Sequence, residues 1–175
     1  MTNIGNVMAK QGDLRGAIRT HEETLAAFRE VGDKSSMVTI LVDIGVELHH
    51  SGDLARARTH VEEGLRISRE IGQMYTTVSA LNSLSYIQTD EGDLDSATKS
   101  CEEALAISRR IGSKPREATT LLALAAIAIE QGNAGAAERY AQDGLERYPT
   151  GQNPEAQADA FDSLAQAHLA ALKLR

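Results

Sequence analysis

Apolar and polar positions follow one another along the chain with the period of an amphipathic helix. The segment 54–71 shows this most clearly, because apolar or small residues recur there at spacings of three and four. They are Leu54, Ala57, Val61, Gly64, Leu65, Ser68 and Ile71. This spacing places them on one face of a helix, while Arg and Glu residues occupy the opposite face. The pattern predicts a helix that is buried on one side and solvated on the other.

The same arrangement returns every forty residues. Glycines occupy one register position, at Gly12, Gly52, Gly92 and Gly132, and each is followed by a capping residue, at Asp13, Asp53, Asp93 and Asn133. Glycine tolerates the left-handed conformation that ends a helix, and Asp or Asn accepts hydrogen bonds from the free N–H groups of the next one. Each Gly-Asp pair therefore predicts a tight corner between two helices. A second glycine position, at Gly32, Gly72 and Gly112, predicts the end of the second helix.

The repeat predicts alternating helices that we call A and B. We expect A helices over 2–11, 35–50, 74–90, 115–130 and 155–172, and B helices over 14–31, 54–71, 94–111 and 134–148. Small residues recur where two helices should cross closely, at Gly45, Ser85, Ala125 and Ala165 and at Ala17, Ala57, Ala97 and Ala137. The chain is therefore expected to be all-α, with about nine helices.

These positions resemble the tetratricopeptide repeat family. The second repeat supplies the family's pattern of large and small residues with Leu41, Ile44-Gly45, Leu48, Gly52, Ala57, Val61 and Gly64. The usual period is 34 residues, whereas here it is forty, which lengthens helix B. Forty-residue repeats of this kind are similar to those of Pins-type scaffolds, kinesin light chain, and the sensor regions of bacterial transcription regulators and signal-transduction ATPases.

The resemblance implies a right-handed superhelical solenoid of antiparallel helix pairs. We expect a single tetratricopeptide-like domain over 1–175, with repeats at about 1–34, 35–73, 74–114 and 115–153 and a C-terminal capping helix at 154–175. The first A helix lacks the early residues of its equivalents. We therefore expect an uncovered face that includes Val7 or Met8, and self-association through this open end.

Composition and charge restrict the partners. The formal net charge is −7, which disfavours binding to a phosphate backbone, so we expect no nucleic acid. We find no apolar run long enough to span a membrane and no signal-peptide pattern. A single cysteine, Cys101, cannot form an internal disulfide, so a cytoplasmic location is expected.

Several residues invite a chemical interpretation, and each has a structural one that we favour. His49 and His50 with Asp90 suggest a metal site, but adjacent helical residues point about 100° apart and do not readily share one ion. Cys101 lies in the apolar column of Val61 and Ala141, which predicts a buried thiol rather than a nucleophile. We therefore expect no enzyme activity, no catalytic residue, no cofactor and no metal.

In the family that the chain resembles, the A helices line a concave surface that binds partners. The contact positions map to Asn6, Val42, Val46, His49, Asn82, Tyr86, Thr89, Leu122, Ala126 and Ile129. The basic clamp that related chaperone-binding repeats use for a terminal carboxylate is missing, because its positions hold Thr2, Ser79 and Ser83. The segments 35–50 and 74–90 contain no Lys or Arg, so an apolar or basic ligand is expected.

The resulting hypothesis is a protein- or peptide-binding scaffold that forms a piece of a longer protein. One alternative stays open from the resemblance: an effector-sensing or autoregulatory region of a bacterial transcription regulator or signal-transduction ATPase. A second alternative is a self-assembling structural element. The full open reading frame would separate the first alternative from a free-standing scaffold, and light scattering would identify the second.

Overall fold

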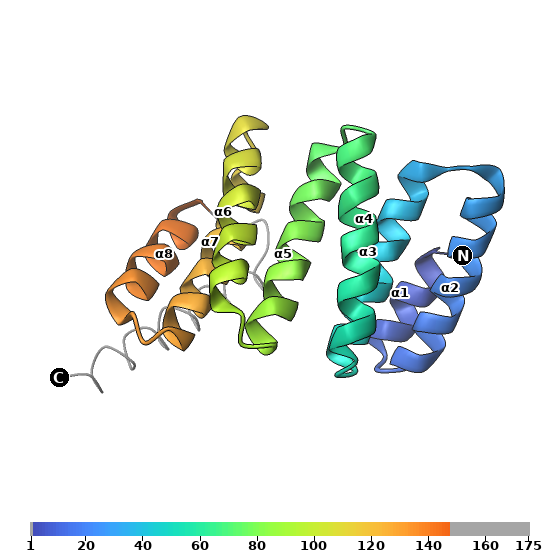
Figure 1. Ribbon diagram of the computed structural model, residues 1–175, viewed down its shortest axis with the longest axis horizontal. Helices are drawn as coiled ribbons and strands as arrows, with labels where there is room; N and C mark the ends of the chain where they lie inside the picture. Colours follow the sequence, from blue (N-terminus) through green and yellow to red (C-terminus); the bar gives the residue numbers. More distant parts are fainter. Residues whose placement is uncertain (1, 148–175) are drawn as a thin grey trace. The chain divides into compact units, whose positions relative to one another are not determined.

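The computed structural model describes residues 2–147, which form eight helices and no strand (Figure 1). They divide into two compact units. Unit 1, Met1–Glu91, holds α1 (Thr2–Lys10), α2 (Leu14–Val31), α3 (Lys34–His50), α4 (Leu54–Glu70) and α5 (Met74–Asp90). Unit 2, Gly92–Arg175, holds α6 (Leu94–Arg110), α7 (Lys114–Glu130) and α8 (Ala134–Arg147). The A and B helices expected in this range are confirmed to within one residue at each end. The expected helix 155–172 and the capping segment lie outside the described residues.

The corners between the helices have the geometry that their sequence predicts. Gly52 has a φ of 85°, and the Asp53 carboxylate accepts a hydrogen bond from the Arg56 backbone N–H at 3.2 Å. The other members of both glycine columns in the described range also have positive φ. Asp13, Asp93 and Asn133 cap their helices in the same way as Asp53. A left-handed glycine followed by a capping side chain therefore sets each A-to-B corner.

Unit 1 is packed around α3, which contacts all four other helices of the unit. The largest buried side chains of this helix are Ile40, Leu41, Ile44 and Leu48. Gly45 sits where α3 crosses α4, and a Cβ at this position would collide with Val61 and approach the Ala57 carbonyl oxygen to 3.3 Å. The predicted close crossing at Gly45 is confirmed, and it brings α3 and α4 together closely enough to exclude any larger residue.

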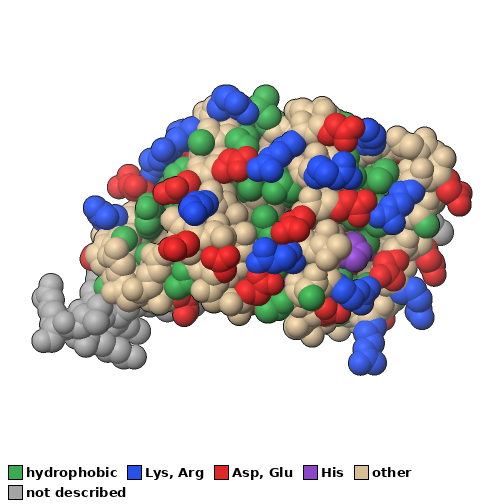
Figure 2. Space-filling model, in the orientation of Figure 1, with side chains coloured by type: hydrophobic (Ala, Val, Ile, Leu, Met, Phe, Trp, Pro, Cys, Tyr) green, Lys and Arg blue, Asp and Glu red, His purple; other side chains and the backbone are tan. Residues whose placement is uncertain are grey.

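The surface formed by α2 and α4 carries acidic and basic side chains interspersed (Figure 2). Some of them pair from one repeat to the next, as Arg29 does with Glu63 and Arg56 with Glu22, each at 2.9 Å. Within α4, Glu62 pairs with Arg58 and not with Arg66, the partner that helical spacing also allows. Such exposed pairs contribute little to stability, typically below about 1 kcal/mol each. This surface is therefore solvated.

Unit 2 has its own apolar core, built mainly from α6 and α7. Its members are Ala97, Cys101, Leu105, Leu121, Ala123, Leu124 and Ile127. Cys101 is fully buried, as its column predicts. Glu117, the one buried acid of this unit in the described range, is held by Lys114 at 3.0 Å and Arg147 at 3.2 Å. None of the eight helices described is both long and apolar enough to cross a membrane.

Candidate functional site

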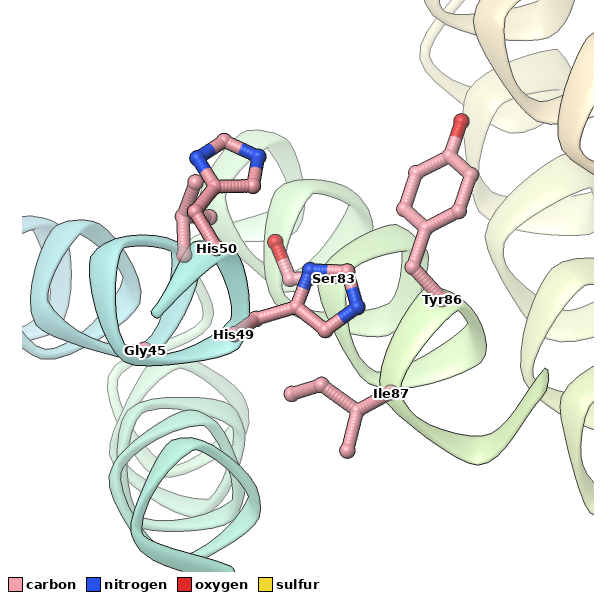
Figure 3. Close-up of a pocket in the computed structure, with 7 residues that line it drawn as sticks. Gly45, His49, His50, Ser83, Tyr86 and Ile87 are labelled. Carbon is pink, nitrogen blue, oxygen red and sulfur yellow. The ribbon is translucent and has the colours of Figure 1, made fainter. Parts of the chain in front are cut away.

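Two neighbouring hollows lie between the A helices in the described part of unit 1. The first, which we call the α3–α5 hollow, has a volume of about 280 Å³. It is lined from α3 by Gly45, Val46, His49 and His50 and from α5 by Ser83, Tyr86 and Ile87. Figure 3 shows His49 extending from α3 toward α5, Ile87 projecting from α5 toward α3, and the Tyr86 ring standing at the α5 side. The walls are mostly apolar, so the hollow suits an apolar side chain.

A histidine–carboxylate contact lies beside the α3–α5 hollow. His49 Nε2 lies 2.6 Å from Asp90 Oδ2, which connects the last turn of α3 to the last turn of α5. The side chains are 19 % and 56 % exposed, so water screens the pair. Breaking this contact should therefore cost little free energy.

The second cavity, which we call the α1–α3 hollow, is larger, at about 480 Å³. It is lined by Asn6, Ala9 and Lys10 from α1, Leu14 from α2, and Asp43, Val46, Glu47 and His50 from α3. Val46 and His50 line both hollows, so the two lie next to each other along α3. This hollow contains two carboxylates, whereas the α3–α5 hollow contains none.

The two hollows are the same feature, one repeat apart. Asn6, Ala9 and Lys10 stand forty residues before Val46, His49 and His50. On the other wall, Asp43, Val46 and Glu47 stand forty residues before Ser83, Tyr86 and Ile87. The repeat therefore fixes where a hollow forms, and the side chains at these positions give each hollow its own chemistry.

A buried histidine–glutamate pair lies behind the α1–α3 hollow. His21 Nδ1, on α2, is 2.9 Å from Glu47 Oε1 and 3.1 Å from Glu47 Oε2, and both side chains are almost fully buried. Sequence reasoning missed this pair, although the repeat register carries a signal for it. His21 occupies the column of Val61, Cys101 and Ala141, and Glu47 occupies the column of Ile87 and Ile127. Two polar residues that interrupt apolar columns on neighbouring helices are expected to meet.

Burial shifts the pKa of both acids in the α1–α3 hollow. Desolvation raises the pKa of Asp43, and the nearby charge of His21 offsets this rise only in part. Desolvation also raises the pKa of Glu47, against the opposing hydrogen bond and charge of His21. Within the described chain, the Oδ2 atom of Asp43 is buried without a hydrogen-bond partner. The described residues therefore compensate the negative charge of Asp43 only in part.

The sequence profile of the tetratricopeptide repeat matches residues 1–70 and 76–150. The chain belongs to the tetratricopeptide repeat family. Repeats of this family generally act as scaffolds that bind proteins or peptides and not as catalysts. No curated protein shows a significant similarity to the chain.

Solved tetratricopeptide-like structures share the fold at low sequence identity. BtubC (BKLC) from P. vanneervenii has a TM-score of 0.80 and 21 % identity, over 95 % of this chain and 70 % of that one. A kinesin light chain repeat protein from Podosopora anserina has a TM-score of 0.76 and 13 % identity, over 98 % and 85 %. A STAND protein with a tetratricopeptide repeat sensor, from Pyrococcus horikoshii, has a TM-score of 0.69 and 17 % identity, over 91 % and 27 %.

The structure brings some of the ten predicted contact positions of this tetratricopeptide repeat chain to the hollows. Val46, His49 and Tyr86 line the α3–α5 hollow, and Asn6 faces Val46 across the α1–α3 hollow. Three positions of one repeat column are buried, at Val42, Asn82 and Leu122. The remaining three are partly buried, at Thr89 on α5 and at Ala126 and Ile129 on α7. Unit 1 therefore holds the four positions that line a hollow.

The two adjacent histidines differ in their contacts in the structure. Their ring centroids are 5.8 Å apart, and Asp90 pairs with His49, although it occupies the repeat position of His50. In the part of the chain that the structure describes, no three His, Cys, Asp or Glu side chains are grouped to hold a metal ion.

The predicted uncovered face of α1 is exposed at Val7, whose side chain is 52 % exposed, and Ile4 on the same helix is exposed as well.

Proposed function

We propose that this tetratricopeptide repeat chain is a binding module without catalytic activity, and that it takes a peptide segment of a partner on the A-helix face of unit 1. The observation that carries the proposal is the α3–α5 hollow. It brings together Val46, His49 and Tyr86, three positions that family resemblance assigns to ligand contact. Tyr86 is 40 % exposed, so its ring offers surface that a ligand in the hollow could cover.

The ligand that fits this face is apolar or basic. Lys34, at the first position of α3, is the only Lys or Arg on α3 and α5. The same two helices carry Asp43, Glu47 and Asp90. Basic side chains in unit 1 lie mainly on α2 and α4, outside the hollows. Charge complementarity would therefore speed the encounter with a Lys- or Arg-containing segment, and salt would slow it.

The remaining predicted positions extend this proposal. In unit 1, Thr89 would make a flanking contact, while Val42 and Asn82 would support the hollow-lining residues from below. Leu122, Ala126 and Ile129 lie on α7 in unit 2, and their contact with a ligand stays a prediction. Self-association through Ile4 and Val7 of α1 is a separate proposal, which light scattering at increasing protein concentration tests.

A peptide-display selection against the isolated chain tests the proposal. Tyr86→Ala should weaken selected peptides about tenfold or more, because it removes one wall of the α3–α5 hollow. Val46→Asp should have a similar effect, because it places a charge between both hollows. Tyr75→Ala is the matched control, since Tyr75 is an exposed tyrosine on the same helix outside the hollow.

The proposal fails if the selected peptides bind Tyr86→Ala and Val46→Asp as well as they bind the unchanged chain. It also fails if the selected peptides are predominantly acidic, because the A-helix face would then repel them.

One structural neighbour favours a second function. The Pyrococcus horikoshii STAND protein contains a tetratricopeptide repeat sensor, and this chain spans about a quarter of that protein's length. The chain would then be the effector-sensing or autoregulatory region of a bacterial transcription regulator or signal-transduction ATPase. A nucleotide-binding or DNA-binding domain in the same open reading frame would support this function, and a reading frame without one would contradict it.

A further inference from the structure

The α1–α3 hollow differs from its equivalent by two acids, one of which has an oxygen that accepts no hydrogen bond within the described residues. Asp43 and Glu47 lie one helical turn apart on α3 and therefore face the same way. At the equivalent positions the α3–α5 hollow has Ser83 and Ile87. Glu47 is engaged by His21, whereas Asp43 Oδ2 is buried and accepts no hydrogen bond within the described residues. His21 compensates the charge of Asp43 only in part, and a cation in the hollow could compensate the rest.

Among the described residues, the charge of His21 compensates Asp43 in part. Lys10 is the one Lys or Arg that lines the hollow, and it forms no ion pair within the described range. Its side chain is exposed at the last turn of α1, where water solvates it. A buried carboxylate oxygen without a hydrogen-bond donor destabilises the folded chain, and more so when the carboxylate is charged. A positively charged group placed in the hollow would remove this cost.

We propose that the α1–α3 hollow binds the guanidinium group of an arginine in the partner peptide, with Asp43 as its counter-ion. Ala9, Leu14 and Val46 supply apolar walls against which the methylene stem of the arginine packs. The amide of Asn6 lies at the same hollow and offers a carbonyl oxygen as a second acceptor. Arginine is favoured over lysine because it presents five N–H donors in a planar fork and is less strongly hydrated.

The inference rests on the proposed peptide-binding function and predicts which side chains of the peptide occupy the two hollows. Because Val46 and His50 belong to both hollows, an arginine in one and an apolar side chain in the other would lie close together on the peptide. We expect selected peptides to carry an arginine a few residues from a large apolar residue. Lys10 would repel the arginine, so removal of its charge should strengthen binding.

Two probes test the inference directly. Acetyl-arginine methylamide is titrated into ¹⁵N-labelled protein, and acetyl-citrulline methylamide serves as a neutral analogue of the same shape. The arginine probe should shift the backbone amide signals of Asp43, Val46 and Glu47 in a saturable way, and the citrulline probe should not. Asp43→Asn should abolish these shifts, whereas Asp95→Asn, the same change on an exposed residue of α6, should leave them intact.

Selected peptides give the quantitative test. Asp43→Asn should weaken an arginine-containing peptide about tenfold, and replacing its arginine by citrulline should weaken binding equally in the unchanged chain but not in Asp43→Asn. Lys10→Gln should tighten binding about threefold. The pattern separates the two proposals. If Tyr86→Ala weakens the peptide but Asp43→Asn and citrulline do not, the arginine inference is wrong and the peptide-binding function stands. If none of these changes matters, both are wrong.

Discussion

The two hollows of unit 1 occupy equivalent places in successive repeats, yet they offer different chemistry. The α3–α5 hollow has Ser83, Tyr86 and Ile87 where the α1–α3 hollow has Asp43, Val46 and Glu47. Packing of the helix pairs sets the position of a hollow, because the small-residue crossings recur with the repeat. The more exposed side chains around each hollow, such as Tyr86 and Asp43, lie outside those crossings and set its preference. A repeat scaffold can therefore change its ligand without changing its fold.

Each hollow also has a histidine–carboxylate pair next to it, and the two pairs differ in how deeply they are buried. His21 and Glu47 are hidden beneath the α1–α3 hollow, whereas His49 and Asp90 are accessible beside the α3–α5 hollow. Loss of one partner leaves a buried polar group in the first case and a hydrated one in the second. The first pair should therefore hold the fold together, and the second should contribute little to it.

Glu47→Ala should have the largest effect on stability. It leaves the His21 side chain buried without its carboxylate, so the free energy of unfolding should fall by about 3–5 kcal/mol. Glu47→Gln keeps an acceptor for His21 and should cost less. Urea unfolding followed by circular dichroism measures both. Equal stabilities of Glu47→Ala and the unchanged chain would show that the pair has no structural role.

Gly5→Ala should have the second-largest effect on the free energy of unfolding, and it should disturb only the α1–α3 hollow. A Cβ on Gly5 would collide with the buried ring of His21, just as one on Gly45 would collide with Val61. Such overpacking costs about 1–3 kcal/mol, and the better helix propensity of Ala returns only about 0.5–1 kcal/mol. Hydrogen exchange should accelerate in α1 and stay unchanged in α5. Uniform acceleration in both helices would contradict the separation of the hollows.

Asp43→Asn should raise stability at neutral pH, by up to about 1 kcal/mol. The pKa of Asp43 in the folded chain lies above its ordinary value of 3.8, because burial disfavours the charge. The folded chain therefore binds the proton more tightly, and stability falls as pH rises through the folded-state pKa. The gain from Asn should be present at pH 7 and vanish below about pH 3.8. Urea unfolding at the two pH values checks this, and a loss of stability at pH 7 would contradict it.

Asp90→Asn should have the smallest effect. Its pair with His49 is exposed, so the free energy of unfolding should change by less than about 1 kcal/mol. The two substitutions Asp90→Asn and Glu47→Ala should therefore differ by several kcal/mol in their effect on the free energy of unfolding, and this difference compares the exposed pair with the buried one. A double-mutant cycle with His49→Ala isolates the pair itself, and a coupling above 2 kcal/mol would mean that exposure is not what separates them.

Much of the fold could be predicted from the sequence because the same helix-ending, capping and small residues recur in each repeat. Gly52 followed by Asp53 fixes a corner through backbone conformation and capping, which are local effects that neighbouring residues reveal. Cys101 could be placed in the core because its column contains Val61 and Ala141. Both predictions depend only on residues near in sequence or at the same repeat position.

The chemistry of the site was less accessible to sequence reasoning. The pairing of His21 with Glu47 requires two unusual residues, 26 positions apart, to be recognised as neighbours across α2 and α3. The pairing of His49 with Asp90 also depends on how α3 and α5 pack, because the sequence alone offered both His49 and His50 as candidate partners of Asp90. Burial of Val42 and Asn82 reflects packing between whole helices. These features arise from tertiary contacts that repeat spacing alone does not specify.

The central claim is that ligands bind on the A-helix face of unit 1, and mapping a selected peptide onto the ¹⁵N-labelled chain tests it most directly. The account predicts that the largest amide shifts fall on Val46, His49, Ser83 and Tyr86, with α2 and α4 unaffected on their charged surface. Shifts concentrated on the charged surface of α2 and α4, with the hollow-lining residues unchanged, would contradict it.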